Sequence, residues 1–157
     1  MTDIGIQVGD ILRSRHLILG TAESCTGGRI ANIITQVPGS SDCFAGGVVS
    51  YSNEVKHNVL GVSEESLVQY GAVSQSVVEQ MALGAIRILG CNCSVATSGI
   101  AGPGGGTPDK PVGTVWIAAA LNEKVVSSCF HFGTERSDNI EKAAHTALEM
   151  LLRLIEK

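Results

Sequence analysis

Short apolar runs alternate along the chain with stretches whose apolar residues repeat at helical spacing. The apolar runs predict five strands, at 17–22, about 45–51, 93–97, about 113–121 and about 124–132. The helical spacing predicts helices at about 4–15, 27–36, 53–59 and 137–156, one capped by Ser63, and one from a Ser76–Glu79 capping box to Leu89. Asn122-Glu123 between the last two strands fits a tight hairpin turn.

The order of these segments predicts the fold class. Strand–helix–strand alternation in the first half favours parallel pairing with helices on both faces of a sheet, and the late hairpin adds an antiparallel strand. We therefore expect a three-layer α/β/α sandwich around a mixed, mostly parallel five-stranded sheet. The 157 residues suit one domain, 1–157, with a sizeable core and with no internal repeat or linker.

Composition and charge exclude several classes of protein. A chain that is 44% hydrophobic and 17% charged is typical of a compact globular protein. The formal net charge is −4 and no basic run occurs, so nucleic acid is not an expected partner, although backbone N–H groups can still hold a small anion. No apolar stretch reaches the ~20 residues that span a bilayer, and the N-terminus lacks signal-peptide features, so we expect a cytoplasmic protein without a membrane partner.

The cysteines and histidines show no metal-binding spacing. The five cysteines form no CxxC pair, and the four histidines show no HxxxH pattern. We therefore expect no metal site, and we expect the thiols to act as small core hydrophobes in a reducing compartment.

The clearest candidate chemistry lies between Ala22 and Lys56. An apolar run leads to Ser24, two glycines follow, and a helical pattern begins at Arg29, so the serine lies at a strand-to-helix turn beside helix-start N–H groups. A second apolar run leads to Tyr51, with Lys56 about one helical turn later, and these side chains could supply the serine with a base. The pattern favours hydrolysis. The alternatives are that Ser24 only caps the helix, that Lys56 is solvated and that Tyr51 covers the sheet end.

The glycine-rich segment 99–107 follows a predicted strand. Ligands of open α/β sheets bind at the carboxyl ends of strands, so this segment could cradle a phosphate or an oxyanion, or it could be a flexible connector. It matches neither a Walker loop nor a dinucleotide fingerprint. Cys25, next to Ser24, is a rival nucleophile, but no histidine lies near it in the sequence, and core packing is its favoured role.

Six sequence blocks closely resemble, in this order, the CinA C-terminal family. The blocks are Thr21–Gly28, Val37–Ser41, Tyr51–Lys56, Tyr70–Ser74, Ser98–Gly105 and Lys110–Val115. The resemblance runs from about residue 5 to about residue 155, and several blocks are specific to this family, which includes nicotinamide-nucleotide amidohydrolases. The family fold is an α/β/α sandwich with a mixed five-stranded sheet, in agreement with the predicted fold.

The resemblance implies an enzyme that hydrolyses nicotinamide mononucleotide to nicotinate mononucleotide and ammonia, a step in pyridine-nucleotide recycling to NAD. It implies a reaction without a metal or other cofactor, in which Ser24 attacks the carboxamide carbon, Lys56 is the general base and Tyr51 assists proton transfer. The expected partners are a small-molecule pyridine nucleotide and further copies of the chain, as a homodimer or a larger homo-oligomer.

The expected substrate-binding groups follow from the same resemblance. Main-chain N–H groups after the serine would stabilise the tetrahedral oxyanion, and the residues expected to do so are Cys25, Thr26, Gly27 and Gly28. The glycine-rich loop would hold the ribose phosphate, through the residues Gly99, Ala101, Gly102, Gly104 and Gly105.

Two departures from the family pattern bear on these expectations. Many relatives have Gly-Asp-Arg where this chain has the segment 133–136, Gly-Thr-Glu-Arg, so the aspartate is absent and Arg136 is displaced by one position. Full-length CinA proteins carry a large N-terminal domain that we expect to be missing here, with its pyrophosphatase activity. The alternatives are a non-catalytic nucleotide-binding or competence-associated protein of this fold, and a serine amidase acting on another small amide.

Overall fold

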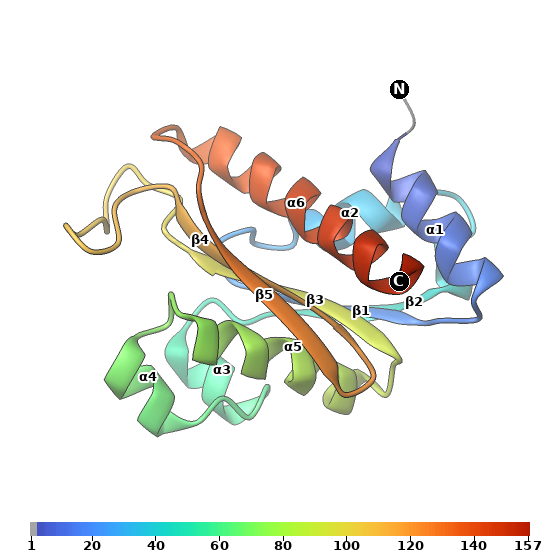
Figure 1. The fold of residues 1–157 in the computed structure, drawn as a ribbon, viewed down its shortest axis with the longest axis horizontal. Coiled ribbons are helices and arrows are strands. Elements are labelled where there is room, and N and C mark those ends of the chain that lie inside the picture. The colour runs from blue at the N-terminus through green and yellow to red at the C-terminus, as the bar shows by residue number, and fades with distance from the viewer. Residues whose placement is uncertain (1–2) are drawn as a thin grey trace.

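Within residues 3–157, which the computed structural model describes, five strands form one mixed sheet (Figure 1). The strands are β1 (Leu19–Glu23), β2 (Phe44–Val49), β3 (Cys93–Gly99), β4 (Thr114–Leu121) and β5 (Lys124–His131). Their order is β2-β1-β3-β4-β5, with β1 parallel to β2 and β3, and β4 antiparallel to β3 and β5. Four strands therefore point the same way and β4 opposes them, which confirms the predicted mixed, mostly parallel sheet.

Helices cover both faces of this sheet and complete the three-layer α/β/α sandwich (Figure 1). One face carries α1 (Ile4–Ser14), α2 (Arg29–Thr35) and α6 (Arg136–Glu156). The other carries α3 (Asn53–Asn58), α4 (Glu64–Tyr70) and α5 (Gln75–Leu89). A short 3-10 turn, Ser40–Asp42, precedes β2.

Each helical layer buries its own hydrophobic core against the sheet. The core under α1, α2 and α6 includes the fully buried Leu12, Ile30 and Leu148. The core under α5 is smaller and includes Val78 and Met81. Fully burying one large aliphatic side chain contributes about 1.5–3 kcal/mol, so the two cores together fix the strands and the loops that leave them.

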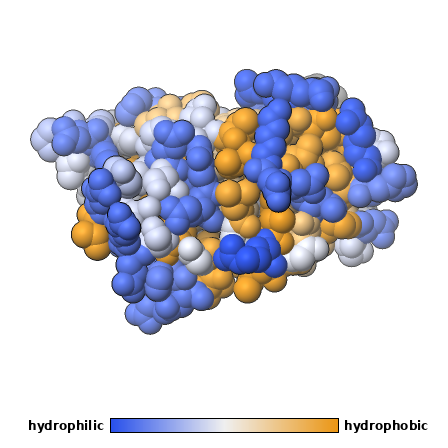
Figure 2. Space-filling view, turned by 60° about the horizontal axis from the view of Figure 1, so that its bottom comes forward, coloured by the Kyte–Doolittle hydropathy of each residue, from blue (hydrophilic) through white to orange (hydrophobic). Residues whose placement is uncertain are grey.

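The layer of α3, α4 and α5 keeps some hydrophobic surface exposed. Figure 2 turns this side of the molecule forward and shows hydrophobic areas between hydrophilic ones. The large exposed hydrophobic residues in and next to these helices are Val59, Val68, Tyr70 and Ile88. Across the described part of the chain, no helix combines the length and the apolarity that a membrane crossing requires.

Side-chain caps determine where the helices of this layer begin. The Ser63 hydroxyl accepts a hydrogen bond from the Ser66 N–H, which confirms the predicted cap of α4. The predicted start of α5 at Ser76 is wrong, because Ser74 is the N-cap and its hydroxyl accepts the N–H of Val77. Ser76 lies inside the first turn, where its hydroxyl contacts that of Ser66 instead.

The loops at the carboxyl ends of β1, β2 and β3 emerge side by side because these strands are parallel neighbours. Glu23, the last residue of β1, pairs with Val49 on β2 and with Thr97 on β3. The β4–β5 hairpin turns at the opposite end of the sheet, near the start of β3, where Asn122 adopts a left-handed φ of 54°, as in the predicted tight turn. The carboxyl edge is where open α/β sheets bind their ligands.

Candidate active site

Ser24 is the first residue after β1, a strand that is buried along its whole length between β2 and β3. Its N–H donates to the carbonyl of Thr97 over 3.0 Å, and the N–H of Ser50 donates to the carbonyl of Glu23 over 2.7 Å. These two bonds continue the pairing of the strands by one residue on each side. Ser24 and Ser50 are therefore held next to each other, with backbone positions fixed by the sheet.

Lys56 meets Ser24 inside the protein. It lies on α3 and is only 1% exposed. Its Nζ is 3.0 Å from the Oγ of Ser24, 2.7 Å from the carbonyl oxygen of Ser50 and 3.3 Å from that of Tyr51. When a neutral amine donates its two hydrogens to the two carbonyls, its lone pair faces the Ser24 hydroxyl. The structure thus brings together the two residues that the sequence placed on separate elements.

Burial shifts the proton equilibrium of this amine toward its neutral form. Desolvation lowers the pKa of Lys56 below the ordinary lysine value, while the neighbouring Cys25 acts more weakly in the opposite direction. No carboxylate within residues 3–157 forms an ion pair with Lys56. A lowered pKa increases the neutral fraction of the amine near pH 7, and the neutral amine is the form that accepts a proton.

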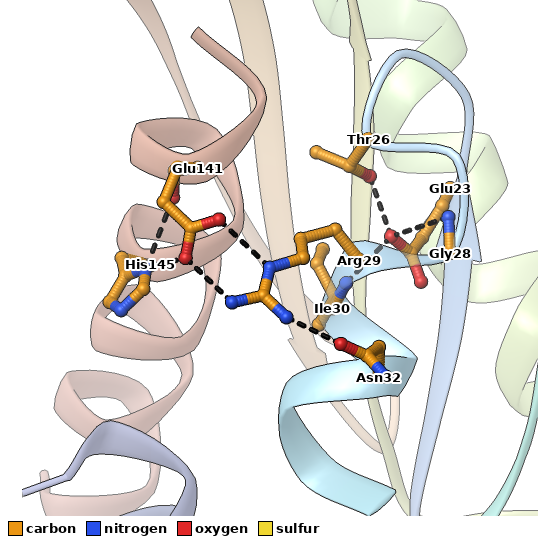
Figure 3. Close-up of polar contacts among 8 residues, drawn as sticks. All are labelled: Glu23, Thr26, Gly28, Arg29, Ile30, Asn32, Glu141 and His145. Carbon is orange, nitrogen blue, oxygen red and sulfur yellow. Dashed lines mark hydrogen bonds and ion pairs between the residues drawn. The ribbon is translucent and has the colours of Figure 1, made fainter. Parts of the chain in front are cut away.

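A tight turn at residues 24–28 joins β1 to α2, and the side chain of Glu23 folds back into it (Figure 3). The carboxylate accepts the hydroxyl of Thr26 over 2.7 Å and the N–H of Gly28 over 3.2 Å. Gly27 and Gly28 have φ values of 57° and 100°, left-handed conformations that glycine adopts without strain. The two glycines therefore allow the chain to turn from the strand into the helix directly after the serine.

The bonding within this turn corrects one prediction. The N–H of Gly27 donates to a carbonyl inside the turn and that of Gly28 donates to Glu23, so neither is free to hold an oxyanion. The N–H groups of Cys25 and Thr26, in contrast, have no carbonyl or carboxylate acceptor in the described part of the chain. Any oxyanion-binding role at this turn is thus narrowed to these two groups.

Cys25 packs into the core under α1, α2 and α6, and the residue also lines the candidate site. Burial raises the pKa of its thiol to about 11, and a hydrogen bond with Thr97 lowers it to a smaller extent. Such a thiol is protonated near neutral pH and is a poor nucleophile. These properties agree with the favoured packing role.

Tyr51 and Arg136 meet at the mouth of the site. Tyr51 is 61% exposed, and its hydroxyl accepts a hydrogen bond from the Arg136 guanidinium over 3.1 Å. Arg136 is the first residue of α6, and it also donates to the carbonyl of Gly102 over 2.7 Å. Tyr51 therefore contributes its main-chain carbonyl to Lys56, whereas its hydroxyl contacts Arg136 rather than Ser24.

A cavity of about 240 Å³ opens beside Ser24 and Lys56. The other lining residues are Cys25, Tyr51, Asn53, Ala72, Val73, Ser98, Gly99, Ala101 and Arg136. Among the predicted loop residues, Gly104 and Gly105 are exposed and lie outside this lining, and Gly102 takes part through its contact with Arg136. Within residues 3–157 no three His, Cys, Asp or Glu side chains gather closely enough to hold a metal ion.

Asn139 fixes the start of the glycine-rich loop. It lies one turn after Arg136 on α6, and its buried Nδ2 donates to the carbonyls of Ala101 over 3.0 Å and Gly133 over 3.1 Å. The loop is therefore anchored where it lines the cavity. Further along, a side chain added at Gly104 would meet nothing within 4 Å and would point into open space.

The sequence model of the CinA C-terminal domain matches residues 2–155. The chain belongs to this family. A CinA-like protein of Chloroherpeton thalassium is 45% identical over 160 residues, which cover 98% of this chain and 38% of that protein. The nicotinamide-nucleotide amidohydrolase PncC of Enterobacter agglomerans is 45% identical over 152 residues, which cover 96% of this chain and 93% of that enzyme. This family member thus spans little more than a third of the CinA-like relative and nearly all of PncC.

Solved structures from the CinA family have the same fold. A CinA superfamily protein of Klebsiella pneumoniae superposes with a TM-score of 0.94 at 33% identity, covering 98% of this chain and 96% of that one. A competence/damage-inducible protein of Agrobacterium tumefaciens gives a TM-score of 0.92 at 39% identity, covering 100% of this chain and 98% of that one. The α/β/α arrangement seen here is therefore the arrangement of the family.

Several residues of this CinA-family site were not predicted. Asn53, Val73 and Ser98 line the cavity, and Asn139 anchors its wall. Ser98 directly precedes the glycine-rich segment, and Val73 lies in one of the blocks that resemble the family. Both therefore lie in segments that the sequence singled out, but nothing in the sequence indicated that they line the cavity. Asn139 lies in the middle of a helical pattern, and no signal in the sequence distinguishes it from a solvent-facing residue.

Proposed function

We propose that the chain is a serine amidohydrolase that converts nicotinamide mononucleotide and water to nicotinate mononucleotide and ammonia. The observation that carries the proposal is the 3.0 Å contact between the Nζ of Lys56 and the Oγ of Ser24 in a buried site. The relative named PncC, which this chain matches over nearly its whole length, supports the choice of substrate.

The first half of the proposed reaction forms an ester on Ser24. The serine Oγ attacks the carboxamide carbon while the neutral amine of Lys56 takes the hydroxyl proton, which produces a tetrahedral intermediate with a negative oxygen. Lys56 passes this proton to the amide nitrogen, the C–N bond breaks and ammonia leaves. The amine is then neutral again, and the carbonyls of Ser50 and Tyr51 still hold it in place.

The second half returns the enzyme to its starting state. Water attacks the ester carbon while Lys56 takes one of its protons, and a second tetrahedral intermediate forms. The C–O bond to Ser24 breaks as the serine oxygen recovers the proton from Lys56, and the product leaves as a carboxylic acid that ionises in water. The net reaction consumes one water and releases one ammonia.

The N–H groups of Cys25 and Thr26 supply the proposed oxyanion site. They belong to the two residues that follow Ser24, and neither has a carbonyl or carboxylate acceptor within the described residues. Donors that are fixed before the reaction stabilise the developing negative oxygen without reorganising, and one such donor typically contributes about 10²–10³-fold in rate. The same two groups serve both tetrahedral intermediates.

Arg136 is the group that we expect to bind the phosphate of the substrate. The cavity of about 240 Å³ is smaller than the ~300–1,000 Å³ of most small-molecule pockets, so it encloses the pyridine carboxamide rather than the whole nucleotide. The ribose phosphate then lies at the mouth, where the guanidinium of Arg136 is held by Tyr51 and Gly102. Guanidinium geometry matches phosphate oxygens, and this placement moves the expected phosphate contact from the glycine-rich loop to α6.

Ammonia release from nicotinamide mononucleotide tests the proposal. The purified protein is treated with a chelator and compared with Ser24→Ala and with Ser14→Ala, a serine in the last turn of α1 that serves as the matched control. We expect ammonia and nicotinate mononucleotide from the wild type and Ser14→Ala, and none from Ser24→Ala. Calorimetric titration of Ser24→Ala with the nucleotide should still show binding, since only the reacting oxygen is removed.

The other outcomes separate the alternative functions. Turnover by Ser24→Ala at the wild-type rate would remove the proposed nucleophile. A folded wild type that leaves nicotinamide mononucleotide intact but releases ammonia from another small amide would be a serine amidase of different specificity. Binding of the nucleotide without any ammonia would indicate a non-catalytic nucleotide-binding protein.

A further inference from the structure

The carboxylate of Glu23 is buried directly before the proposed nucleophile. The residue is 1% exposed, and no Lys, Arg or His within residues 3–157 forms an ion pair with it. One carboxylate oxygen accepts the Thr26 hydroxyl and the N–H groups of Gly28 and Ile30 (Figure 3). The other oxygen accepts the N–H of Ala31. A buried charge is therefore stabilised by four hydrogen bonds, three of them from the start of α2.

These four donors fit only a side chain whose two terminal atoms both accept hydrogen bonds, as those of a carboxylate do. All four partners donate, over distances of 2.7–3.2 Å. In a glutamine of the same shape, the oxygen could accept on one side, but the NH₂ group would face the N–H of Ala31, donor against donor. Leaving a buried donor unsatisfied is costly, so the turn would have to rearrange.

The main chain of Glu23 also contacts Ser50, which in turn contacts Lys56, the proposed base. Its carbonyl accepts both the N–H of Ser50, over 2.7 Å, and the Ser50 hydroxyl, over 3.2 Å. The carbonyl of Ser50 in turn accepts the Nζ of Lys56 over 2.7 Å, and this Nζ lies 3.0 Å from the Oγ of Ser24. The side chain of Glu23 thus holds the turn that carries Ser24. Its main-chain carbonyl holds Ser50, whose own carbonyl orients the amine of Lys56.

We propose that Glu23 is a positioning residue, whose carboxylate fixes the turn at 24–28 so that the Oγ of Ser24 faces Lys56. The inference rests on the proposed function, because it assigns Glu23 a role in the reaction of Ser24. The carboxylate also occupies the amino end of α2. Within the turn, the N–H groups of Cys25 and Thr26 are those without a carbonyl or carboxylate acceptor among residues 3–157.

The effect of Glu23→Gln follows from the geometry. Displacing a reacting group by about 1 Å can lower the rate by about 10²-fold. We expect kcat to fall by about 10²-fold and KM to change by less than about threefold, because the side chain of Glu23 does not line the cavity. A variant that was merely less stable would keep the wild-type kcat at temperatures where it is fully folded.

Asp3→Asn is the matched control. Asp3 is also a carboxylate at the start of a helix, accepting the N–H groups of Gly5 over 2.8 Å and Ile6 over 3.3 Å, but it caps α1. The same loss of charge there should leave kcat unchanged. Thr26→Val is a second test variant, since it keeps the size of the side chain and removes one donor to Glu23, and we expect it to lower kcat by about 10-fold.

Two readouts distinguish a failure of this inference from a failure of the proposed function. Steady-state hydrolysis of nicotinamide mononucleotide gives kcat and KM for all variants at a temperature where melting curves show each to be folded. Covalent labelling of Ser24 by a fluorophosphonate probe, followed by mass spectrometry, reports the reactivity of the serine without that substrate. If Glu23→Gln fails to fold, Thr26→Val carries the same comparison.

Slower turnover and slower labelling in Glu23→Gln, with Asp3→Asn unchanged, support the positioning role. Wild-type kcat and labelling in Glu23→Gln and Thr26→Val overturn it. A wild type that is labelled at Ser24 but leaves the nucleotide intact overturns the proposed substrate, and the labelling rates still decide the role of Glu23. A wild type that shows neither activity overturns both proposals.

Discussion

Replacing Lys56 with methionine tests the catalytic role of the buried amine and its charge state together. The variant keeps an unbranched side chain but loses three hydrogen bonds, to the Ser24 hydroxyl and to the carbonyls of Ser50 and Tyr51. At a net ~1 kcal/mol for each bond, the loss lowers the free energy of unfolding by about 3 kcal/mol where the amine is neutral in both the folded and the unfolded state. Turnover should fall by about 10²–10⁴-fold, the usual contribution of a general base, or about 3–5 kcal/mol in the barrier.

The pH dependence of this stability difference gives the sharper test. Burial lowers the pKa of Lys56, so between its folded value and the ordinary 10.5 the unfolded chain binds more protons than the folded protein. The free energy of unfolding of the wild type therefore rises with pH in this window, and the contribution is lost as the pH falls. Methionine has no such proton. The deficit of Lys56→Met relative to the wild type should thus be largest near pH 10.5 and shrink toward pH 7.

Urea unfolding at several pH values measures this difference. The fluorescence of Trp116, the single tryptophan of the chain, follows the transition. Lys142→Met, at an exposed position of α6, is the matched control, and its stability difference from the wild type should stay constant with pH. A Lys56→Met deficit that is constant, or that grows toward pH 7, would show that Lys56 is charged in the folded protein and would refute the argument for a neutral base.

Two further predictions concern packing and thiol reactivity. Gly84→Ala places a Cβ in steric overlap with the carbonyl oxygen of Leu60, so α5 must shift. We expect the free energy of unfolding to fall by at least about 2 kcal/mol, seen as a lower urea midpoint, and an unchanged midpoint would contradict the close packing. Near neutral pH, iodoacetamide should modify the exposed Cys129 before Cys25, because burial raises the pKa of the Cys25 thiol to about 11. Peptide mass spectrometry records the order of modification. Faster reaction at Cys25 would identify it as a competing nucleophile.

Apolar periodicity is sufficient to predict the strands and the long helices, because each of them buries one face or both. The strand expected at 17–22 is β1 at 19–23, and the helix expected at 137–156 is α6 at 136–156. The start of α5 could not be predicted in the same way, because Ser74 and Ser76 are both able to cap a helix. The choice depends on a tertiary contact, since the Ser76 hydroxyl pairs with Ser66 on α4.

The candidate site likewise contains some residues whose positions follow from the sequence order and others whose positions depend on tertiary contacts. Ser24 and Lys56 are 32 residues apart in a strand–helix–strand–helix segment, so the sequence order alone brings them to one edge of the sheet. Arg136 was identified by its displacement from the family pattern, but its position depends on how α6 docks against the loop at Gly102. The burial of the Glu23 side chain could not be predicted either, because a glutamate at the end of a strand is compatible with a solvated side chain.

The turn of the hairpin between β4 and β5 should tolerate inserted segments without disturbing the proposed active site. Asn122 and Glu123 are exposed, and they lie at the end of the sheet opposite to the turn that carries Ser24. Foreign segments are tolerated best at exposed loop tips that few contacts tie down. A peptide tag, a fluorescent protein or new chain termini introduced between these two residues should therefore leave the reaction intact, which makes this hairpin the natural attachment point for building reporters and fusion proteins from this fold.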